Sequence, residues 1–327
     1  MLHRLLRVVG GASKYTGAVP DGLEKDPPFT ANFVLFRGTR IAQNPFTLTY
    51  SSINARSGIA GSSPMLTYPK IDPVIFSIGV VKVHWYGLMY VIGFLFAWWL
   101  ARKRTRKSDS PISTAQIDDL IFYGMLGVIL GGRLGYSLVY GWAQLTSDPW
   151  YIFKITEGGM SFHGGLVGVI TAMWLYGRRI GVDFWTVADF VAPIVPLGLG
   201  FGRIGNFING ELWGKPSDVP WAFNVNGVGL HPSQLYEALL EGLTLFIILW
   251  WYSSRPRARM AVSGIFLLCY GLFRFFIEFY RMPDAQLSYL AFGWVTMGQI
   301  LTTPMIVGGL VLLLVARRQS RQPAPGA

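Results

Sequence analysis

The sequence is poor in charged residues, and this shortage excludes most soluble folds. Charged residues make up only 14% of the 327 residues, hydrophobic residues make up 52%, and the mean hydropathy is +0.40. Soluble domains carry about a quarter charged residues because their surfaces face water. The composition therefore predicts an integral membrane protein.

Cysteine and acidic residues are also scarce. The single cysteine, Cys269, lies inside an apolar run, so neither a disulfide framework nor a thiolate metal site is expected within one chain. The net charge of +11 would suggest a nucleic-acid partner in a soluble protein. In a membrane protein, basic residues instead gather in cytoplasmic loops. We therefore predict no nucleic-acid partner, metal or cofactor.

The first 64 residues lack any apolar run long enough to span a bilayer, and they lack the continuous apolar core of a signal peptide. We predict that residues 1–64 are a non-native extension produced by an upstream start assignment, and that the natural start is Met65. A disordered or targeting extension is the alternative.

Beyond Met65 the sequence has seven apolar runs, each near the ~20 residues that cross the hydrocarbon core. They cover residues 86–101, 119–141, 163–177, 185–208, 234–252, 262–279 and 297–316. We predict an all-α polytopic protein of about seven transmembrane helices. The first and third runs are short, so their helices should extend into flanking polar residues.

Two patterns predict local geometry within these runs. Glycines recur at four-residue spacing, which lets membrane helices approach closely; the sets are Gly127, Gly131 and Gly135, then Gly164 and Gly168, then Gly198 and Gly202. Pro193 and Pro196 should kink the fourth run.

Basic residues predict the orientation of the helices. Thirteen lysines and arginines follow the first, third, fifth and seventh runs, whereas the other loops between runs hold only Lys154, Lys215 and Arg281. Because lysine and arginine favour the cytoplasmic side, the N-terminus should lie outside and the C-terminus inside. We expect a membrane domain at residues 65–318 and a cytoplasmic tail at 319–327.

Three arginines lie inside the apolar runs: Arg133, Arg203 and Arg274. Each costs roughly 2.5–3.5 kcal/mol at a helix centre, so each needs a counter-charge or an anionic ligand. Glu278 follows Arg274 by one turn and Glu211 lies close to Arg203. Buried ion pairing is therefore an alternative to function, with most weight at Arg133.

Polar residues concentrate at the predicted external ends of the helices. The stretch Gly202–Gly214 combines Arg203, Asn206, Glu211 and several glycines. His163 opens the third run, and Tyr86 opens the first within His84-Trp85-Tyr86-Gly87. A structural histidine and an interfacial aromatic belt are the alternatives at these two positions, and His231-Pro232-Ser233-Gln234 could be only the start of a helix.

Guanidinium groups bind phosphate oxygens in a planar, bidentate manner. Two arginines facing one polar pocket therefore indicate a site for an anionic lipid headgroup in the external leaflet. A histidine, a tyrosine and a carboxylate are available there for proton transfer.

These residues resemble those of the prolipoprotein diacylglyceryl transferase family, from about Asp72 to Arg318. The longest match is Gly202–Gly214. The others are Asp72-Pro73-Val74-Ile75-Phe76, His84-Trp85-Tyr86-Gly87, Gly159–Gly165, His231–Glu237 and Tyr270–Glu278. The residues before Met65 and the short loop Lys215–Leu230 depart from the family pattern.

The resemblance implies a reaction and its partners. A diacylglyceryl group moves from phosphatidylglycerol to the thiol of the lipobox cysteine in a prolipoprotein signal peptide, and glycerol phosphate leaves. The expected location is the bacterial cytoplasmic (inner) membrane, with the active site towards the external leaflet.

The resemblance also implies roles for individual residues. His163 or Glu211 would act as the base, and Tyr86 would orient a group. Arg203 would bind the phosphate of phosphatidylglycerol, with Arg274 as a second clamp. The remaining substrate-binding candidates are Asn206, Gly214, Tyr270 and Glu278. Gly214 would serve backbone geometry and Glu278 would hold Arg274.

An anionic-lipid transporter or binding protein could use the same arginines. Transporters more often show inverted repeats with paired broken helices, and we find no corresponding halves in the sequence. A scaffold that only holds a signal peptide would not require costly membrane arginines. Release of glycerol phosphate from phosphatidylglycerol vesicles in the presence of a lipobox peptide separates the three classes.

Overall fold

The computed structural model describes residues 65–69, 71–78, 81–107, 110–154, 158–283 and 289–320. The chain divides into two units, residues 1–59 and 60–327, and all of the described residues belong to the second. The predicted extension, residues 1–64, lies outside the described residues, as do residues 321–327 of the predicted tail.

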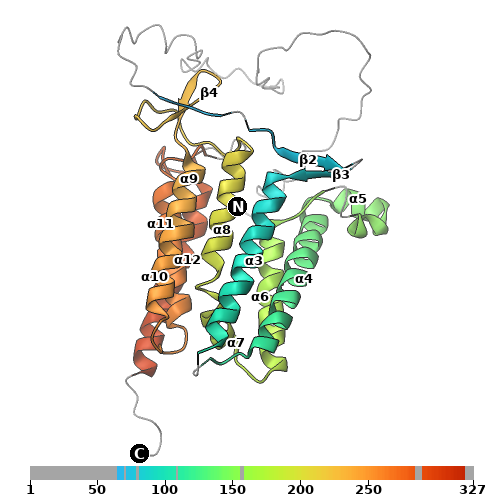
Figure 1. Ribbon diagram of the computed structural model, residues 1–327, viewed down its shortest axis with the longest axis vertical. Helices are drawn as coiled ribbons and strands as arrows, with labels where there is room; N and C mark the ends of the chain where they lie inside the picture. The colour runs from blue at the N-terminus through green and yellow to red at the C-terminus, as the bar shows by residue number, and fades with distance from the viewer. Residues whose placement is uncertain are drawn as a thin grey trace, which may run out of the picture. The chain divides into compact units, whose positions relative to one another are not determined.

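The described part of the chain is mostly helical, and its long helices alternate in direction (Figure 1). Every predicted apolar run coincides with helical structure. The helical elements in these runs are α3 (Trp85–Thr105), α4 (Thr114–Val139), α6 (Phe162–Arg179), α7 (Phe184–Val191), α8 (Val195–Ile208), α9 (Ser233–Glu237), η3 (Ala238–Thr244), α10 (Leu245–Tyr252), α11 (Ala261–Ile277) and α12 (Met297–Gln319). The first and third runs extend into flanking polar residues, as predicted.

Two continuous helices among the described residues are long and apolar enough to cross a membrane. One is Ser233–Tyr252, which consists of α9, η3 and α10, and the other is α12, Met297–Gln319. The bent pair α7 and α8 makes a third if it forms one span. The count of seven spans stays a prediction. Large apolar side chains such as Val91, Leu130 and Val311 are exposed on the helices, which suits contact with lipid rather than water.

Close packing of α4 against α6 depends on glycine, as the spacing predicted. A Cβ atom added at Gly127 would lie 2.5 Å from the carbonyl oxygen of Gly168, and a Cβ atom at Gly131 would collide with the carbonyl oxygen of Gly164. The third predicted set is confirmed at Gly198, because a Cβ atom at Gly93 of α3 would lie 3.3 Å from the Gly198 Cα atom. Gly200, which the spacing did not single out, makes a further close contact with Gly242.

The fourth apolar run is bent by 50° between α7 and α8, which confirms the predicted kink at Pro193 and Pro196. The fifth run contains the π-helical segment η3 between α9 and α10. A π-helical turn within an α-helix is rare and often marks a functional site. A Cβ atom at Gly242 would lie 2.7 Å from the Cα atom of Gly200, so this segment lies directly against α8.

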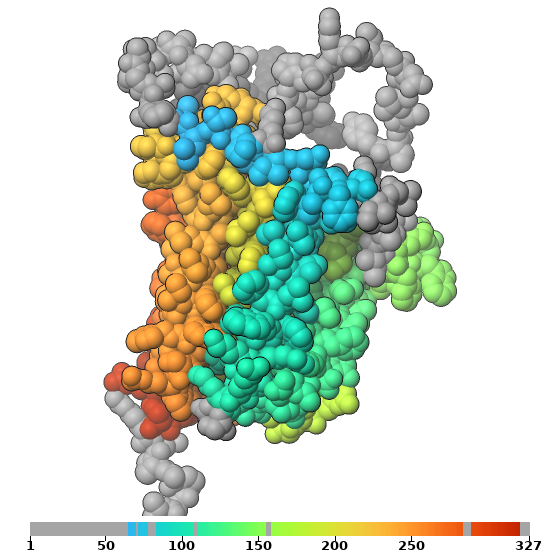
Figure 2. Space-filling model, in the orientation of Figure 1, coloured from blue at the N-terminus to red at the C-terminus, as the bar shows by residue number. Residues whose placement is uncertain are grey.

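Short strands correct the all-α prediction. Strands β2 (Val74–Ile78) and β3 (Val81–His84) form an antiparallel pair ahead of α3. Strand β4 (Phe223–Val225) pairs with β5 (Val228–Leu230) and, in parallel, with β1 (Leu66–Thr67). Figure 2 shows β1 and the β2–β3 pair lying across one end of the helices. Strands β1, β4 and β5, of two or three residues each, are too short to give a periodicity signal in the sequence.

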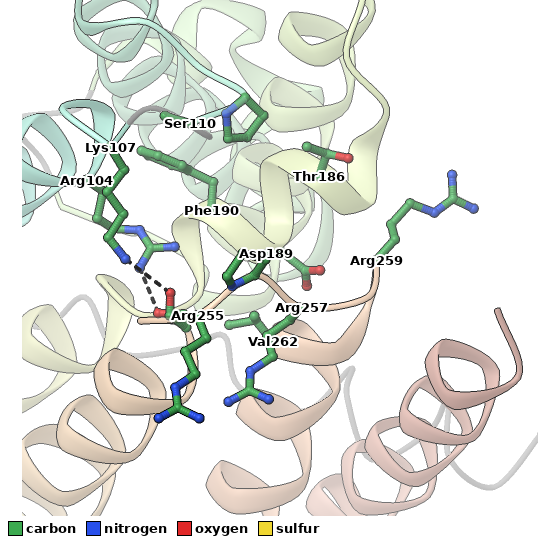
Figure 3. Close-up of a pocket in the computed structure, with 13 residues that line it drawn as sticks. Arg104, Lys107, Ser110, Thr186, Asp189, Phe190, Arg255, Arg257, Arg259 and Val262 are labelled. Carbon is green, nitrogen blue, oxygen red and sulfur yellow. Dashed lines mark hydrogen bonds between the residues drawn. The ribbon is translucent and has the colours of Figure 1, made fainter. Parts of the chain in front are cut away.

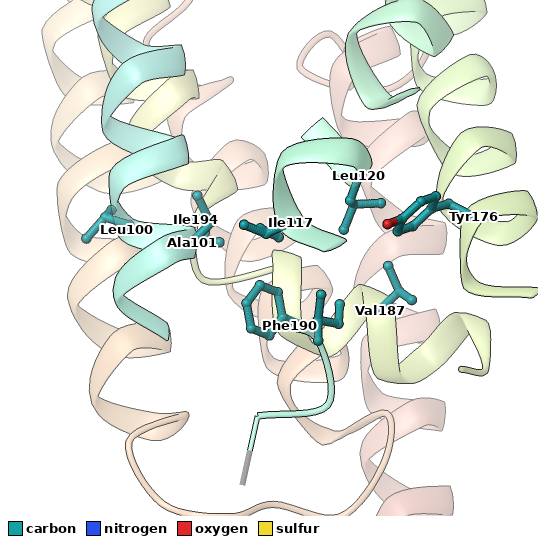
Figure 4. Close-up of a cluster of buried hydrophobic side chains, with 9 residues drawn as sticks. Leu100, Ala101, Ile117, Leu120, Tyr176, Val187, Phe190 and Ile194 are labelled. Carbon is teal, nitrogen blue, oxygen red and sulfur yellow. The ribbon is translucent and has the colours of Figure 1, made fainter. Parts of the chain in front are cut away.

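A hydrophobic cluster joins α3, α4, α6 and α7 near the opposite end (Figure 4). Its members include Leu100, Ile117, Tyr176, Val187 and Phe190, all at most 4% exposed. The Tyr176 hydroxyl donates a 2.9 Å hydrogen bond to the Gln116 carbonyl. This core holds the helices together at their lower ends in Figure 1. The polar stretch Gly202–Gly214 lies at the other end of the helices, near the strands.

Candidate functional site

Three arginines and three glutamates meet between α8, α9–η3 and α11, near the strand end of the helices. We call this group the arginine–glutamate cluster; its members are Arg203, Arg274, Arg281, Glu237, Glu241 and Glu278. The six side chains come from segments far apart in the sequence. The cluster balances three positive and three negative formal charges, as expected of ionisable groups removed from water.

Glu237 lies at the centre of the cluster and its side chain is fully buried. One carboxylate oxygen lies 2.7 Å from Nε of Arg203, and the other lies 2.6 Å from Nη1 of Arg274 and also contacts Arg281. One carboxylate therefore joins three guanidinium groups. The close approach of Gly200 to Gly242 brings α9–η3 near enough to α8 for the bond to Arg203.

Arg274 is held on two sides. Its Nη2 atom lies 2.6 Å from Oε1 of Glu278, and Glu278 in turn accepts a 2.8 Å hydrogen bond from the hydroxyl of Thr296. A Cβ atom at Gly298 would lie 2.5 Å from the Glu278 carboxyl carbon, so glycine leaves room for this carboxylate. The predicted pairing of Glu278 with Arg274 is therefore present.

Arg203 is the more open of these two arginines, with 25% of its side chain exposed against 15% for Arg274. Its Nη1 atom donates a long, 3.4 Å hydrogen bond to Asn206, and Asn206 donates a 2.7 Å bond to the carboxylate of Glu211. Glu211 is exposed. A polar chain thus runs from the buried Glu237 through Arg203 and Asn206 to the surface at Glu211.

The backbone of the polar stretch is fixed from several directions. Gly214 donates a 2.9 Å hydrogen bond to the His231 carbonyl, and a side chain at this position would collide with the Tyr280 carbonyl. The Tyr68 hydroxyl donates to the carbonyls of Phe207 and Ile208 at the end of α8. These two bonds tie the residues before Trp85 to carbonyls in the last turn of α8, where helix acceptors have few partners within the helix.

Histidine 231 precedes α9, with its Nδ1 atom 3.0 Å from the Tyr236 hydroxyl. Burial lowers the pKa of His231 from its ordinary value, because the charged ring would lose contact with water.

Tyr86 lies against α8 beside the polar stretch. Its hydroxyl is 2.9 Å from the Tyr90 hydroxyl, and a Cβ atom at Gly205 would lie 2.9 Å from the Tyr86 ring. Tyr270 stacks on Phe266 with ring centroids 5.9 Å apart. No hydrogen bond from Tyr270 to Arg274 is found among the described contacts.

The structure does not bring His163 into the arginine–glutamate cluster. His163 is exposed in the first turn of α6, and its ring contacts Phe162 edge-on. Among the described residues, it makes no hydrogen bond or ion pair with Arg203, Glu211 or Arg274. The role of His163 as a base stays a prediction.

Arg133 is buried, and none of its partners among the described residues is a carboxylate. Its described hydrogen bonds go to main-chain carbonyls of Tyr151, Ile152, Gly158 and Gly159, and its guanidinium lies 4.6 Å from the Tyr151 ring centroid. Arg133 therefore holds the segment between α4 and α6. The ion-pair alternative is wrong within the part of the chain that the structure describes.

Sequence reasoning missed Glu237, Glu241 and Arg281 as members of the site. A signal was present for the two glutamates, because they are four residues apart inside the fifth apolar run. Ionisable residues within a membrane helix indicate function by default. Arg281 lies beyond the sixth run, and only the fold brings it to Glu237.

Comparison with known proteins identifies the family. The family model described as prolipoprotein diacylglyceryl transferase matches residues 73–315. The chain belongs to the prolipoprotein diacylglyceryl transferase family. The resemblance seen in the sequence is confirmed. The matched range includes the whole arginine–glutamate cluster, together with Tyr86, His163 and Gly214.

Curated relatives in the prolipoprotein diacylglyceryl transferase family match over nearly their full lengths. The phosphatidylglycerol–prolipoprotein diacylglyceryl transferase of Methylococcus capsulatus is 62% identical over 256 residues, covering 77% of this chain and 98% of that protein. Its counterpart in Ectopseudomonas mendocina is 56% identical over 267 residues, covering 80% of this chain and 100% of that protein. The Chromohalobacter salexigens enzyme is 57% identical over 258 residues, covering 78% of this chain and 96% of that protein.

No group of three or more His, Cys, Asp or Glu side chains in the described ranges is arranged to hold a metal ion. The cluster and the adjoining polar stretch present guanidinium, carboxylate and amide groups. Guanidinium groups can bind phosphate oxygens, and an exposed carboxylate can accept a proton.

Proposed function

We propose that the protein transfers the diacylglyceryl group of phosphatidylglycerol to the thiol of a prolipoprotein lipobox cysteine. The cysteine sulfur forms a thioether bond to the glyceryl carbon that carries the phosphate. The bond between that carbon and the phosphate oxygen breaks, and glycerol phosphate leaves with the electron pair. A base accepts the thiol proton. The family membership and the names of the curated relatives support this reaction.

The observation that carries the proposal is the position of Arg203. Glu237 fixes its Nε atom at 2.7 Å, while its outer side is turned towards Asn206 and is a quarter exposed. A guanidinium held in this way can present a planar pair of donors to phosphate oxygens. We infer that Arg203 binds the phosphate and stabilises its charge as the leaving group departs.

Arg274 has a more constrained part in this proposal. Its guanidinium is already paired with Glu237 and Glu278. Arg274 would therefore act on the substrate by orienting the other members of the cluster, or would contact it only after these ion pairs rearrange. Glu278, with Tyr270 two turns before it, would keep Arg274 in place. Asn206 would donate to headgroup oxygens, and Gly214 would keep the loop backbone in position.

The thiol needs activation, because free cysteine has a pKa near ~8.5. Glu211 is exposed and joined to Asn206 by a 2.7 Å hydrogen bond, which puts a carboxylate at the open edge of the site. His163 is the other candidate base, and Tyr86 would orient a reacting group. Arg203 would also favour the thiolate by its positive charge.

The proposal includes a location and a topology. We infer a bacterial inner-membrane protein of about seven spans, with the N-terminus outside, the C-terminus inside and the active site towards the external leaflet. The strict alternation of basic loops supports this orientation. Residues 65–318 would form the transferase, which acts on a prolipoprotein signal peptide and lies among membrane lipids.

The test is transfer from phosphatidylglycerol vesicles to a lipobox peptide, followed by release of glycerol phosphate. We expect Arg203→Ala to reduce the rate at least about 10²-fold, as expected when a donor to a developing anion is lost. Arg106→Ala is the matched control, because Arg106 is exposed outside the polar site. Unchanged turnover by Arg203→Ala would contradict the assignment of the phosphate site.

The same assay separates the candidate bases. His163→Gln and Glu211→Gln are compared with the unaltered chain, and the base is the residue whose loss abolishes transfer while phosphatidylglycerol still binds. Near-normal turnover by His163→Gln would leave the histidine a structural role. Movement of lipid without glycerol phosphate would exclude the transferase reaction.

A further inference from the structure

A cavity lined by several basic residues lies at the other end of the helices, away from the arginine–glutamate cluster. It occupies about 390 Å³ between the end of α3, the segment before α4, helix α7 and the loop before α11 (Figure 3). Helix α11 begins beside this cavity at Ala261 and reaches Arg274 thirteen residues later, about 20 Å along the helix. The two sites are therefore distinct.

The lining of this cavity is strongly cationic. The five basic side chains in it are Arg104, Lys107, Arg255, Arg257 and Arg259. Asp189 is the single carboxylate among the lining residues that the structure describes. Apolar walls from Phe190 and Val262 adjoin the charges. In Figure 3 the basic side chains come from both sides of Asp189, from α3 and from the loop before α11.

Asp189 does not neutralise these cations by direct pairing. One of its oxygens accepts a 2.8 Å hydrogen bond from the Met260 amide, and the other accepts bonds of 2.8 and 2.6 Å from the amide and hydroxyl of Ser263. The carboxylate thus binds the start of α11, where helix amides lack partners of their own. It fixes the loop that carries three of the five cations.

Among the described residues, Arg255 and Arg257 of this loop have guanidinium nitrogens without a hydrogen-bond partner. Arg257 uses Nε for a 2.7 Å bond to the Tyr252 carbonyl and stacks on the Tyr252 ring, which leaves its outer nitrogens available. Arg255 makes no hydrogen bond, ion pair or ring contact with another described residue. Both side chains extend from the loop in the same direction in Figure 3. Arg259 lies 3.5 Å from Asp183 and is about half exposed.

We propose that this cavity binds a phosphate group, and that its usual source is the headgroup of an anionic phospholipid in the leaflet at that end of the helices. Guanidinium groups suit phosphate oxygens, and several cations around one cavity favour an anion over water. The adjoining apolar walls and the position at the helix ends favour a lipid over free phosphate. The inference does not depend on the transfer reaction.

The test uses the purified full chain in nanodiscs of phosphatidylcholine that contain graded amounts of phosphatidic acid. Native mass spectrometry counts the phosphatidic acid molecules retained by the protein. We expect Arg255→Gln/Arg257→Gln to retain one molecule fewer and to raise the half-saturating lipid fraction about tenfold. Arg255→Gln alone should change lipid retention in the same direction. It keeps the test valid if the double variant folds poorly, because Arg255 has no described hydrogen bond or ion pair to lose.

Arg317→Gln/Arg318→Gln is the matched control. It removes the same charge from the same end of the helices, outside the cavity. Equal loss of lipid in the control would show general attraction of anionic lipid and would overturn the proposal, as would unchanged binding in the cavity variants. Titration with inorganic phosphate identifies the source of the bound group. If inorganic phosphate binds and Arg255→Gln weakens that binding, the source is free phosphate. If phosphatidic acid binds and inorganic phosphate does not, the source is the lipid.

A third variant distinguishes lipid bound at the site proposed for phosphatidylglycerol from lipid bound at the cavity. Arg203→Ala should lose lipid held near the arginine–glutamate cluster and keep the molecule that Arg255→Gln releases. If the transferase proposal fails, the number of phosphatidic acid molecules held at the cavity is unchanged. Failure of the cavity proposal leaves transfer activity and the Arg203 effect unchanged.

Discussion

At the scale of single residues, Glu237 decides the geometry of the polar site. Its carboxylate contacts Arg203, Arg274 and Arg281 at once, and it has no exposure to water. Removing one partner from a buried ion pair lowers the stability of the folded protein far more than replacing the whole pair with apolar residues, because the remaining charge is left buried without a counter-charge. Glu241, one turn later, makes only a 3.8 Å approach to Arg274.

We predict that Glu237→Gln lowers the free energy of unfolding by about 3–5 kcal/mol, since three guanidinium groups then share a neutral side chain. Glu241→Gln is the matched control, because Glu241 is equally buried and neither of its oxygens has a hydrogen-bond partner in the described structure. Thermal unfolding in detergent measures both variants. Equal losses at the two positions would contradict a special role for Glu237.

The residues found from the sequence are those whose partners are close along the chain. Arg203, Asn206 and Glu211 fall within nine residues, and Glu278 follows Arg274 by one helical turn. Glu237 joins Arg203 across 34 positions, and its contact depends on how α9 packs on α8. Such a contact follows from the fold and not from spacing, which is why Glu237 was missed.

At the scale of elements, hydrophobic length predicted the helices and glycine spacing predicted one of their contacts. Every apolar run is helical, because a polar backbone in an apolar surrounding must bond to itself. The strands β1, β4 and β5 were not predicted, because two or three residues give no periodicity. In α8, Gly198 approaches Gly93 of α3, as the four-residue spacing predicted, whereas the contact of Gly200 with Gly242 was not predicted.

We predict that Gly168→Ala destabilises the protein by about 1–3 kcal/mol, as overpacking does in a close contact. The added methyl group would collide with the Gly127 carbonyl between α4 and α6. Gly198→Ala is the control, because a Cβ atom there meets nothing within 4 Å. Thermal unfolding of the two variants in the same detergent should differ. A Gly168→Ala protein as stable as Gly198→Ala would exclude the close helix contact.

At the scale of the whole molecule, the predicted transferase is confined to residues 65–318. The family model matches residues 73–315, within that range. We predict that a chain beginning at Met65 transfers diacylglyceryl groups within about twofold of the rate of the chain beginning at Met1. The vesicle assay with equal amounts of each membrane-inserted protein checks this. A loss of activity on removing residues 1–64 would assign them a function.

The two ends of the helices differ in chemistry, and this difference supports the proposed orientation. The end near the strands carries the arginine–glutamate cluster, where cations and carboxylates balance. The other end carries the cavity of Arg255 and Arg257 and the basic residues that close α3, α6 and α12. Basic residues near helix ends favour the cytoplasmic side, so the balanced end should face outward.

Cysteine labelling tests this orientation directly, because the sequence has a single cysteine, Cys269. On a Cys269→Ser background, Asp218→Cys places a thiol on the loop near the strands and Ser254→Cys places one at the opposite end; both positions are exposed. We expect a membrane-impermeant maleimide to label Asp218→Cys in intact cells and to label Ser254→Cys only after the membrane is opened. The reverse pattern would place the polar site on the cytoplasmic face, where a substrate on the external leaflet could not reach Arg203.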